Sequence, residues 1–197
     1  MVVLKNNLEN LNYQVYLADL PLTFKSLEKS VEILKRQVAD LLKKFNNEDK
    51  INLVAHSTGG LVVRRLIKEG DLNHRINRCV LIASPNKGSL LSQMSAKLPF
   101  FNKIFKTADS IRPINVKEMD LASSGEIEIG AAAGTKSNLF LGRFLDSKND
   151  GRIKVDSVKY KGLKDFVELP YGHKEIHYKK ETAELIDNFL KTGKFKV

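Results

Sequence analysis

The sequence predicts an α/β fold in which a mostly parallel sheet carries helices on both faces. Segments with helical periodicity alternate with short apolar segments of strand length along the chain, as is typical of parallel sheets with crossover helices. Several of the short segments are apolar at consecutive positions, such as 78–83 after its first residue, Arg78. Such runs are typical of strands that helices cover on both faces.

The first part of the chain is expected to form a helix, a strand and a second helix. Leu4, Leu8 and Leu11 recur at helical spacing and predict an amphipathic helix. Residues 13–18 are rich in tyrosine and aliphatic residues and predict a strand, which ends before Pro21. A long helix with one buried stripe follows, indicated by Leu27, Val31, Leu34, Val38, Leu41 and Phe45.

The rest of the chain continues the alternation within one domain, residues 1–197. Further strands are predicted at 51–55, 78–83, 126–133 and 165–169. Helices are predicted from Leu61 to a stop at Gly70 and over 179–191. Residues 90–106 also have helical spacing, interrupted at Pro99, and segment 90–120 is a candidate lid.

Composition narrows the class of protein. The chain has 197 residues, 42% hydrophobic and 28% charged, which suits one globular domain. It has one cysteine, Cys79, no leader-like N-terminus and no apolar run near the ~20 residues of a membrane span. A cytoplasmic location is therefore expected. The net charge of +10 leaves contact with an anionic membrane surface open, but lysines are spread along the chain and no nucleic-acid partner is expected.

Residues 51–63 carry the most informative motif. An apolar strand is followed by Ala55-His56-Ser57-Thr58-Gly59 and then by apolar residues at helical spacing. Strand, sharp turn and helix with a serine at the tip is the layout of a nucleophile elbow, whose usual pattern is G-x-S-x-G. In that layout the N–H of Thr58 faces a developing oxyanion. The alternative is a plain strand-to-helix turn with an incidental serine, but the flanking strand and helix favour a nucleophile.

A serine nucleophile needs a base, and we look for it beyond the carboxyl end of a strand. His173 follows the last predicted strand, with Gly172 before it, whereas His177 lies four residues further on. His56 precedes the nucleophile and should point away from the tip of the elbow, and His74 lies at the wrong end of a strand. Placement favours His173 over His177, although either can be an ordinary solvated histidine.

The base in turn needs an orienting acid. Asp146, Asp150 and Asp156 lie in the loop after the strand at 126–133, and Asp150 is favoured because Gly151 and the alternating residues 153–155 follow it. A turn aspartate is the commoner role for Asp-Gly. The sequence has no phosphate-binding loop, no dinucleotide fingerprint and no paired metal histidines, so we expect no cofactor and no metal.

Together these segments resemble the α/β-hydrolases of the small lipase and esterase branch. The similar segments are 55–60 (Ala-His-Ser-Thr-Gly-Gly), 83–89 (Ala-Ser-Pro-Asn-Lys-Gly-Ser), 149–155 (Asn-Asp-Gly-Arg-Ile-Lys-Val) and 172–177 (Gly-His-Lys-Glu-Ile-His). The resemblance implies hydrolysis of carboxylic esters, with a small-molecule or lipid ester as substrate. It assigns attack to Ser57, proton transfer to His173 and orientation of that histidine to Asp150.

The resemblance also shows a departure and a candidate substrate region. The family has a central strand ending in His-Gly before the first helix, and its loop supplies a second oxyanion donor; this sequence contains no His-Gly. We therefore expect an N-terminally incomplete hydrolase fold in which the second donor is unassigned. The segment at 90–106 lies where the family often inserts a lid, and Leu98, Phe101 and Phe105 are candidates to contact an acyl chain. An ordinary packed helix pair explains the same spacing equally well.

Three functions fit the sequence. The first is a serine esterase or lipase, favoured by the order Ser57, Asp150, His173. The second is a non-catalytic or weakly active hydrolase-like protein that serves as a binding module, favoured by the missing His-Gly. The third is an acyltransferase that uses the same three residues, which the sequence does not separate from a hydrolase.

Overall fold

The computed structural model describes residues 1–22, 25–95, 111–119, 127–137, 142 and 145–196. Most of the candidate lid lies outside these residues, and so do all three candidate acyl-chain contacts: Leu98, Phe101 and Phe105. Only the short helices α4 (Leu90–Ser95) and α7 (Pro113–Glu118) are described within segment 90–120.

A four-stranded parallel sheet forms the centre of the described fold. Its strands are β1 (Ile51–His56), β2 (Ile76–Ile82), β3 (Glu128–Gly134) and β4 (Asp165–Leu169). They lie in sequence order, and each pairs in parallel with the next. The carboxyl ends of all four strands therefore meet at one edge, where loops can bring distant residues together.

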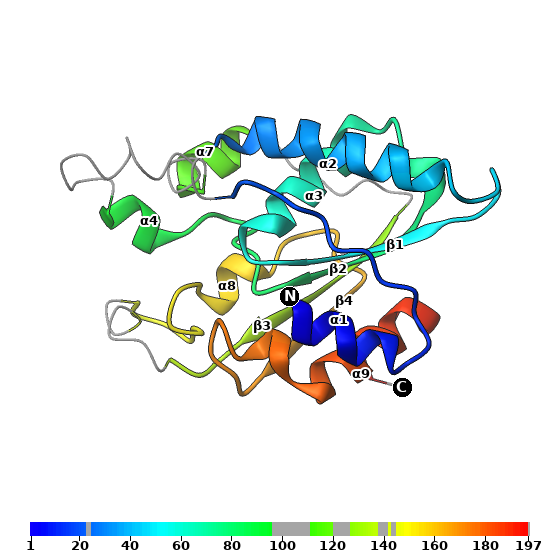
Figure 1. The fold of residues 1–197 in the computed structure, drawn as a ribbon. Helices are drawn as coiled ribbons and strands as arrows, with labels where there is room; N and C mark the ends of the chain where they lie inside the picture. The colour runs from blue at the N-terminus through cyan, green and yellow to red at the C-terminus, as the bar shows by residue number, and fades with distance from the viewer. Residues whose placement is uncertain (23–24, 96–110, 120–126, 138–141, 143–144, 197) are drawn as a thin grey trace.

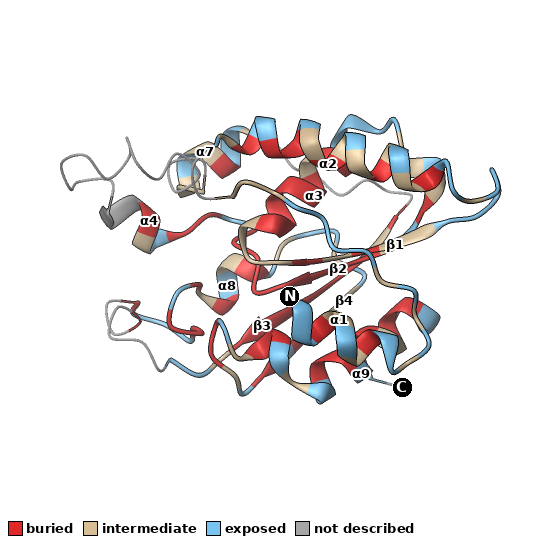
Figure 2. Cartoon of the chain, viewed as in Figure 1, coloured by how far each residue is buried: buried red, intermediate tan, exposed pale blue. Residues whose placement is uncertain are grey.

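Helices cover both faces of this sheet (Figure 1). On one face α2 (Leu27–Leu42), α3 (Thr58–Glu69) and α8 (Val155–Val158) share a hydrophobic cluster with the strands. On the other face α1 (Val2–Glu9) and α9 (Lys180–Thr192) form a second cluster. Figure 2 shows buried strands between two helix layers whose outer surfaces are exposed. The prediction of an α/β fold with helices on both faces is confirmed.

The apolar runs in the sequence fit this layered arrangement. In β2, Cys79 and Leu81 belong to the first cluster, whereas Val80 and Ile82 belong to the second. Successive side chains of a strand point to opposite faces. A strand with helices on both sides is therefore apolar at consecutive positions, as residues 79–83 are.

Helix limits follow local capping signals. The side chain of Ser26 accepts a hydrogen bond from the N–H of Lys29 at the start of α2. Gly70 ends α3 in the left-handed conformation, at φ 83°, as the sequence predicts. The first helix ends at Glu9, short of Leu11, and α2 ends at Leu42, short of Phe45.

The strand predicted at residues 13–18 is wrong. The segment has no regular secondary structure, and Figure 1 shows it running from α1 past β1 toward α2. Isolated contacts rather than a strand partner hold its backbone groups: the N–H of Tyr13 donates to the carbonyl of Leu8, and Lys5 donates to the carbonyl of Val15. Directly after the segment, Gln37 exchanges two hydrogen bonds with the backbone of Asp19. Strand propensity alone does not make a strand where no ladder forms.

Two short 3₁₀ helices complete the described elements: η1 (Asn73–Arg75) before β2 and η3 (Ile176–Tyr178) before α9. Within the described ranges, no helix has both the length and the apolar character that crossing a bilayer requires.

Candidate active site

The turn between β1 and α3 holds Ser57 in a strained conformation. Its φ of 54° and ψ of −132° lie in a region that L-residues rarely adopt, and such strain persists only where the surrounding structure enforces it. Directly after the turn, Gly60 lies against the strand-end residue Ser84. A Cβ at Gly60 would lie 2.0 Å from the Ser84 hydroxyl oxygen, so any larger residue would push the turn away from the sheet.

The hydroxyl of Ser57 meets the imidazole of His173. The distance from Ser57 Oγ to His173 Nε2 is 3.0 Å, although 116 positions separate the two residues. His173 lies in the loop after β4 and its side chain is buried, at 3% exposure. Its Nδ1 lies 2.7 Å from Asp150 Oδ2, and a carboxylate only accepts. Nδ1 therefore carries the proton, and Nε2 is left to accept the hydrogen bond from Ser57.

Asp150 is held by hydrogen bonds to both of its carboxylate oxygens. Oδ1 accepts from the N–H groups of Arg152 and Ile153, at 2.9 and 2.8 Å, while Oδ2 faces His173. The side chain is 1% exposed. A buried carboxylate with its lone pairs used in this way has a fixed orientation. It can hold the imidazole in one tautomer and stabilise a positive charge on it.

The loops that carry the acid and the base also contact each other through their backbones. The N–H of His173 donates to the carbonyl of Asp150 at 2.9 Å. Gly134, the last residue of β3, permits this approach, because a Cβ there would lie 2.5 Å from the carbonyl oxygen of Tyr171 and 2.8 Å from Asp150 Cβ. The strand end therefore forms a floor on which both loops pack.

Other residues considered from sequence occupy different positions. Asp146 pairs with Lys154 at the surface, and Asp156 is exposed. His74 is exposed at the opposite end of β2. His177 is buried, and within the described part of the chain its Nδ1 has no hydrogen-bond partner. Burial lowers the pKa of His177 to about 4, so this residue is neutral at pH 7.

His56 is closer to the base than the sequence indicates. The prediction that it points away from the tip of the elbow misses its contact with the base loop: Nε2 lies 2.9 Å from the carbonyl oxygen of His173. Its ring lies between those of His173 and His177, with centroid distances of 4.9 and 4.3 Å. Burial, and then the neighbouring histidines, lower the pKa of His56 to about 3. Its position directly before Ser57 was the one available signal.

The N–H of Thr58, predicted from the sequence as an oxyanion donor, lies next to Ser57 at the start of α3. Thr58 is the first residue of α3, and the first N–H groups of a helix have no partner within it. No hydrogen bond to this N–H occurs among the described residues. The positive end of the helix dipole also lies at this point, which favours negative charge beside Ser57.

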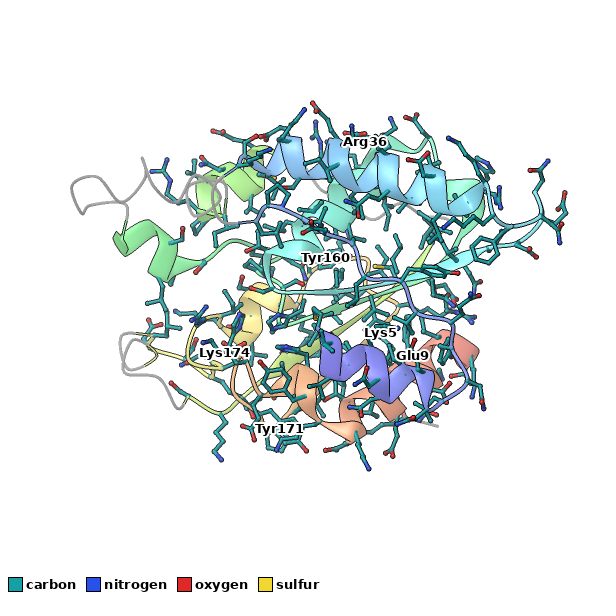
Figure 3. All side chains as sticks on the ribbon, in the orientation of Figure 1. Lys5, Glu9, Arg36, Tyr160, Tyr171 and Lys174 are labelled. Carbon is teal, nitrogen blue, oxygen red and sulfur yellow. The ribbon has the colours of Figure 1, made fainter. Side chains whose placement is uncertain are left out.

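A buried arginine fastens the loops around the elbow helix. Arg64 of α3 donates from Nη1 to the backbone and side-chain oxygens of Asn86, at 3.2 and 3.3 Å. Asn86 donates in turn to the carbonyl of Val158 at 2.7 Å. The guanidinium of Arg64 also stacks on Tyr160, 3.9 Å from the ring centroid. Tyr160, labelled in Figure 3, packs against the hydrophobic cluster that the sheet shares with α2 and α3. The loop after β2 and the segment after Asp150 are thereby tied to one helix.

No group of three or more His, Cys, Asp or Glu side chains in the described residues has an arrangement that could hold a metal ion. Separately, the structure brings Ser57, His173 and Asp150 into one chain of hydrogen-bond contacts, and these are the three residues that the sequence predicts as nucleophile, base and acid.

The comparisons with known proteins agree with the fold. Residues 26–119 match a family model described as a domain of unknown function, DUF7379. No curated protein matches the sequence. Among solved structures, the mature form of the Bacillus licheniformis lipase BlEst2 is similar, with a TM-score of 0.68 and 16% identity over 87% of this chain. The metagenomic carboxyl esterase MGS0156 has a TM-score of 0.68 and 16% identity over 86%.

The phospholipase PlaB from Legionella pneumophila, in a complex with thio-NAD, has a TM-score of 0.62 and 20% identity over 79% of this chain. The match spans 76% of the BlEst2 chain, 57% of the MGS0156 chain and 40% of the PlaB chain. At these identities the likeness establishes the fold, and this chain has the α/β-hydrolase fold.

Proposed function

We propose that this chain is a carboxylic ester hydrolase, an esterase or lipase, that works through an acyl-enzyme on Ser57. The observation that carries the proposal is the continuous contact from Ser57 Oγ to His173 Nε2, at 3.0 Å, and from His173 Nδ1 to Asp150 Oδ2, at 2.7 Å. A serine activated by an oriented histidine is the arrangement that acyl transfer requires. The solved lipases and esterases of the same fold add support.

In the proposed mechanism, Ser57 Oγ attacks the ester carbonyl carbon while its proton moves to His173 Nε2. The carbonyl oxygen becomes an oxyanion, to which the N–H of Thr58 donates. When the intermediate collapses, the C–O bond to the alcohol breaks, and the alcohol oxygen takes the proton from Nε2. A water molecule then gives a proton to Nε2 and attacks the acyl carbon. The bond from Ser57 Oγ to the acyl carbon breaks, Oγ takes the proton back from Nε2, and the acid is released.

We propose an ester with an apolar acyl group as the substrate, contacted by Leu98, Phe101 and Phe105. The net charge of +10 supports contact with an anionic membrane surface. A reducing, cytoplasmic setting is proposed because the single cysteine, Cys79, is buried and free. An acyltransferase would use the same acyl-enzyme with an alcohol in place of water.

The test is covalent labelling of the serine. A fluorophosphonate should add one label at Ser57, and Ser57→Ala should lose both the label and the hydrolysis of p-nitrophenyl butyrate, because no other described group is activated in this way. Ser92→Ala, on α4, is the matched control and should label normally. Labelling that persists in Ser57→Ala would refute the proposal. A correctly folded parent chain that neither labels nor turns over would favour the non-catalytic alternative.

A further inference from the structure

Since the turn that presents Ser57 also carries His56, we propose that His56 is a positioning residue. Its Nε2–H···O=C bond to His173 fixes the base loop relative to the nucleophile. The inference rests on the proposed function, and it adds a residue to the three that hold the reacting groups. The hydrogen bond is 2.9 Å long and spans 117 positions of sequence.

The direction of this hydrogen bond follows from its chemistry. A carbonyl oxygen only accepts, so Nε2 of His56 carries the proton and donates. A neutral imidazole has one protonated nitrogen, and the pKa of about 3 keeps His56 neutral at the pH of ester hydrolysis. His56 therefore presents one donor and no charge to the base. It holds His173 without opposing the positive charge that His173 acquires when it takes the proton of Ser57.

The neighbouring residues make the contact a rigid one. The backbone of His173 is held at both ends, because its N–H donates to Asp150 and its carbonyl accepts from His56. The ring of His56 is packed between His173 and His177. His56 is the last residue of β1, and its backbone pairs with Ile82 of β2. Ser57 follows His56 in the chain, and His173 is bonded to its side chain. Both partners of the Ser57–His173 hydrogen bond are therefore held at the carboxyl end of β1.

The alternative is that His56 only fills space beside the rings of His173 and His177. Shape and hydrogen bonding can be separated with three substitutions. His56→Phe keeps a ring of similar size without the donor. His56→Gln places an amide N–H near the position of Nε2, whereas the amide of His56→Asn is too short to reach it. His74→Phe, at an exposed histidine on the far end of β2, is the matched control.

The experiment measures kcat and KM for p-nitrophenyl butyrate, the fluorophosphonate labelling rate and the melting temperature of each full-length variant. His56→Phe should lower kcat about 10- to 100-fold with KM within about twofold, because a small displacement of the base slows chemistry rather than binding. His56→Gln should recover most of that loss even if its melting temperature stays low. His74→Phe should match the parent chain.

A parent-like kcat in folded His56→Phe would overturn the proposal. If His56→Phe does not fold, kcat is compared between His56→Gln and His56→Asn instead. A clearly higher kcat for the glutamine variant supports the donor role of His56, and equal kcat values overturn it. These failures are distinct from failure of the proposed function, which appears without any change at residue 56: either Ser57→Ala retains label and turnover, or the folded parent chain neither labels nor turns over.

Discussion

The nucleophile and the base of this site are positioned in different ways. The elbow is local: its strand, its strained serine and its glycines lie within residues 51–60, and Ser84 is the nearby residue that Gly60 must accommodate. The base loop after β4 contains a short turn, in which the N–H groups of Glu175 and Ile176 donate to the carbonyl of Gly172. Its attachment to the rest of the site comes from Asp150, 23 positions earlier than His173, and from His56, 117 positions earlier.

This difference predicts how the elbow and the base loop respond to substitutions. A local turn should keep its geometry when distant residues are replaced, since its strain is enforced by the adjoining strand and helix. A loop held by long-range hydrogen bonds should lose its geometry when any one partner is removed. Substitutions in the chain should therefore disturb the base more readily than the nucleophile, and the predictions below test that asymmetry.

The largest effect is expected from replacing the base itself. His173→Ala should lower kcat by about 10⁶-fold, a loss typical of removing a triad histidine. His177→Ala should change kcat by less than about tenfold at a temperature where the variant is folded, because no hydrogen bond joins His177 to Ser57 or Asp150 in the described residues. Steady-state rates with p-nitrophenyl butyrate give both values. A dead His177→Ala beside an active His173→Ala would reverse the assignment.

The next largest effect concerns the acid. Asp150→Asn should keep the fold but lower kcat by about 10⁴-fold, because the amide can donate to His173 and favour the wrong tautomer. Asp146→Asn is the matched control, since Asp146 is exposed in the same loop and pairs only with Lys154 among described residues. The two rates are compared after circular dichroism shows equal folding. Loss of activity in the control, with Asp150→Asn unaffected, would move the acid.

The contrast between the local elbow and the base loop, which long-range contacts hold, also explains which features could be predicted from the sequence. Local signals predict the elbow, the helix stop at Gly70 and the runs of β2, because short-range sterics and two-sided burial dictate them. The prediction of a strand at 13–18 was wrong because strand formation depends on a neighbouring strand to pair with, which the local sequence does not reveal. His173 and Asp150 were selected by their places after strands. The contact of His56 with the carbonyl of His173 could not be predicted from the sequence, because it depends on the position in space of a loop more than a hundred residues further along the chain.

Gly134 is a second residue whose role in the site depends on distant segments of the chain. In sequence it is only the glycine that ends a predicted strand. In the structure its missing Cβ leaves the space that the Tyr171 carbonyl and the Asp150 side chain occupy. Its role is defined by two later segments of the chain, so a single sequence read in order gives no reason to include it in the site.

The smallest expected effect is a loss of stability in acid, and it tests the two histidines that pack together beside the base, His56 at the end of β1 and His177 in η3. Burial lowers the pKa of His177 from 6.5 to about 4, and burial with neighbouring histidines lowers that of His56 from 6.5 to about 3. In the unfolded chain both take up a proton near pH 6.5, so the unfolded state binds more protons than the folded state between that pH and the lowered pKa values. Stability is therefore full above about pH 7 and falls as the pH drops.

Each histidine should remove up to about 1.4 kcal/mol of unfolding free energy per pH unit in that range, or roughly 2 kcal/mol between pH 7 and pH 5. Urea titrations at the two pH values measure this loss. His177→Phe should abolish its own share of the pH dependence, and His74→Phe, at an exposed histidine, should leave the whole dependence in place. A parent chain equally stable at pH 7 and pH 5 would mean that the base loop opens enough to hydrate these rings. The long-range contacts would then hold the loop less firmly than the elbow is held by its own strand and helix.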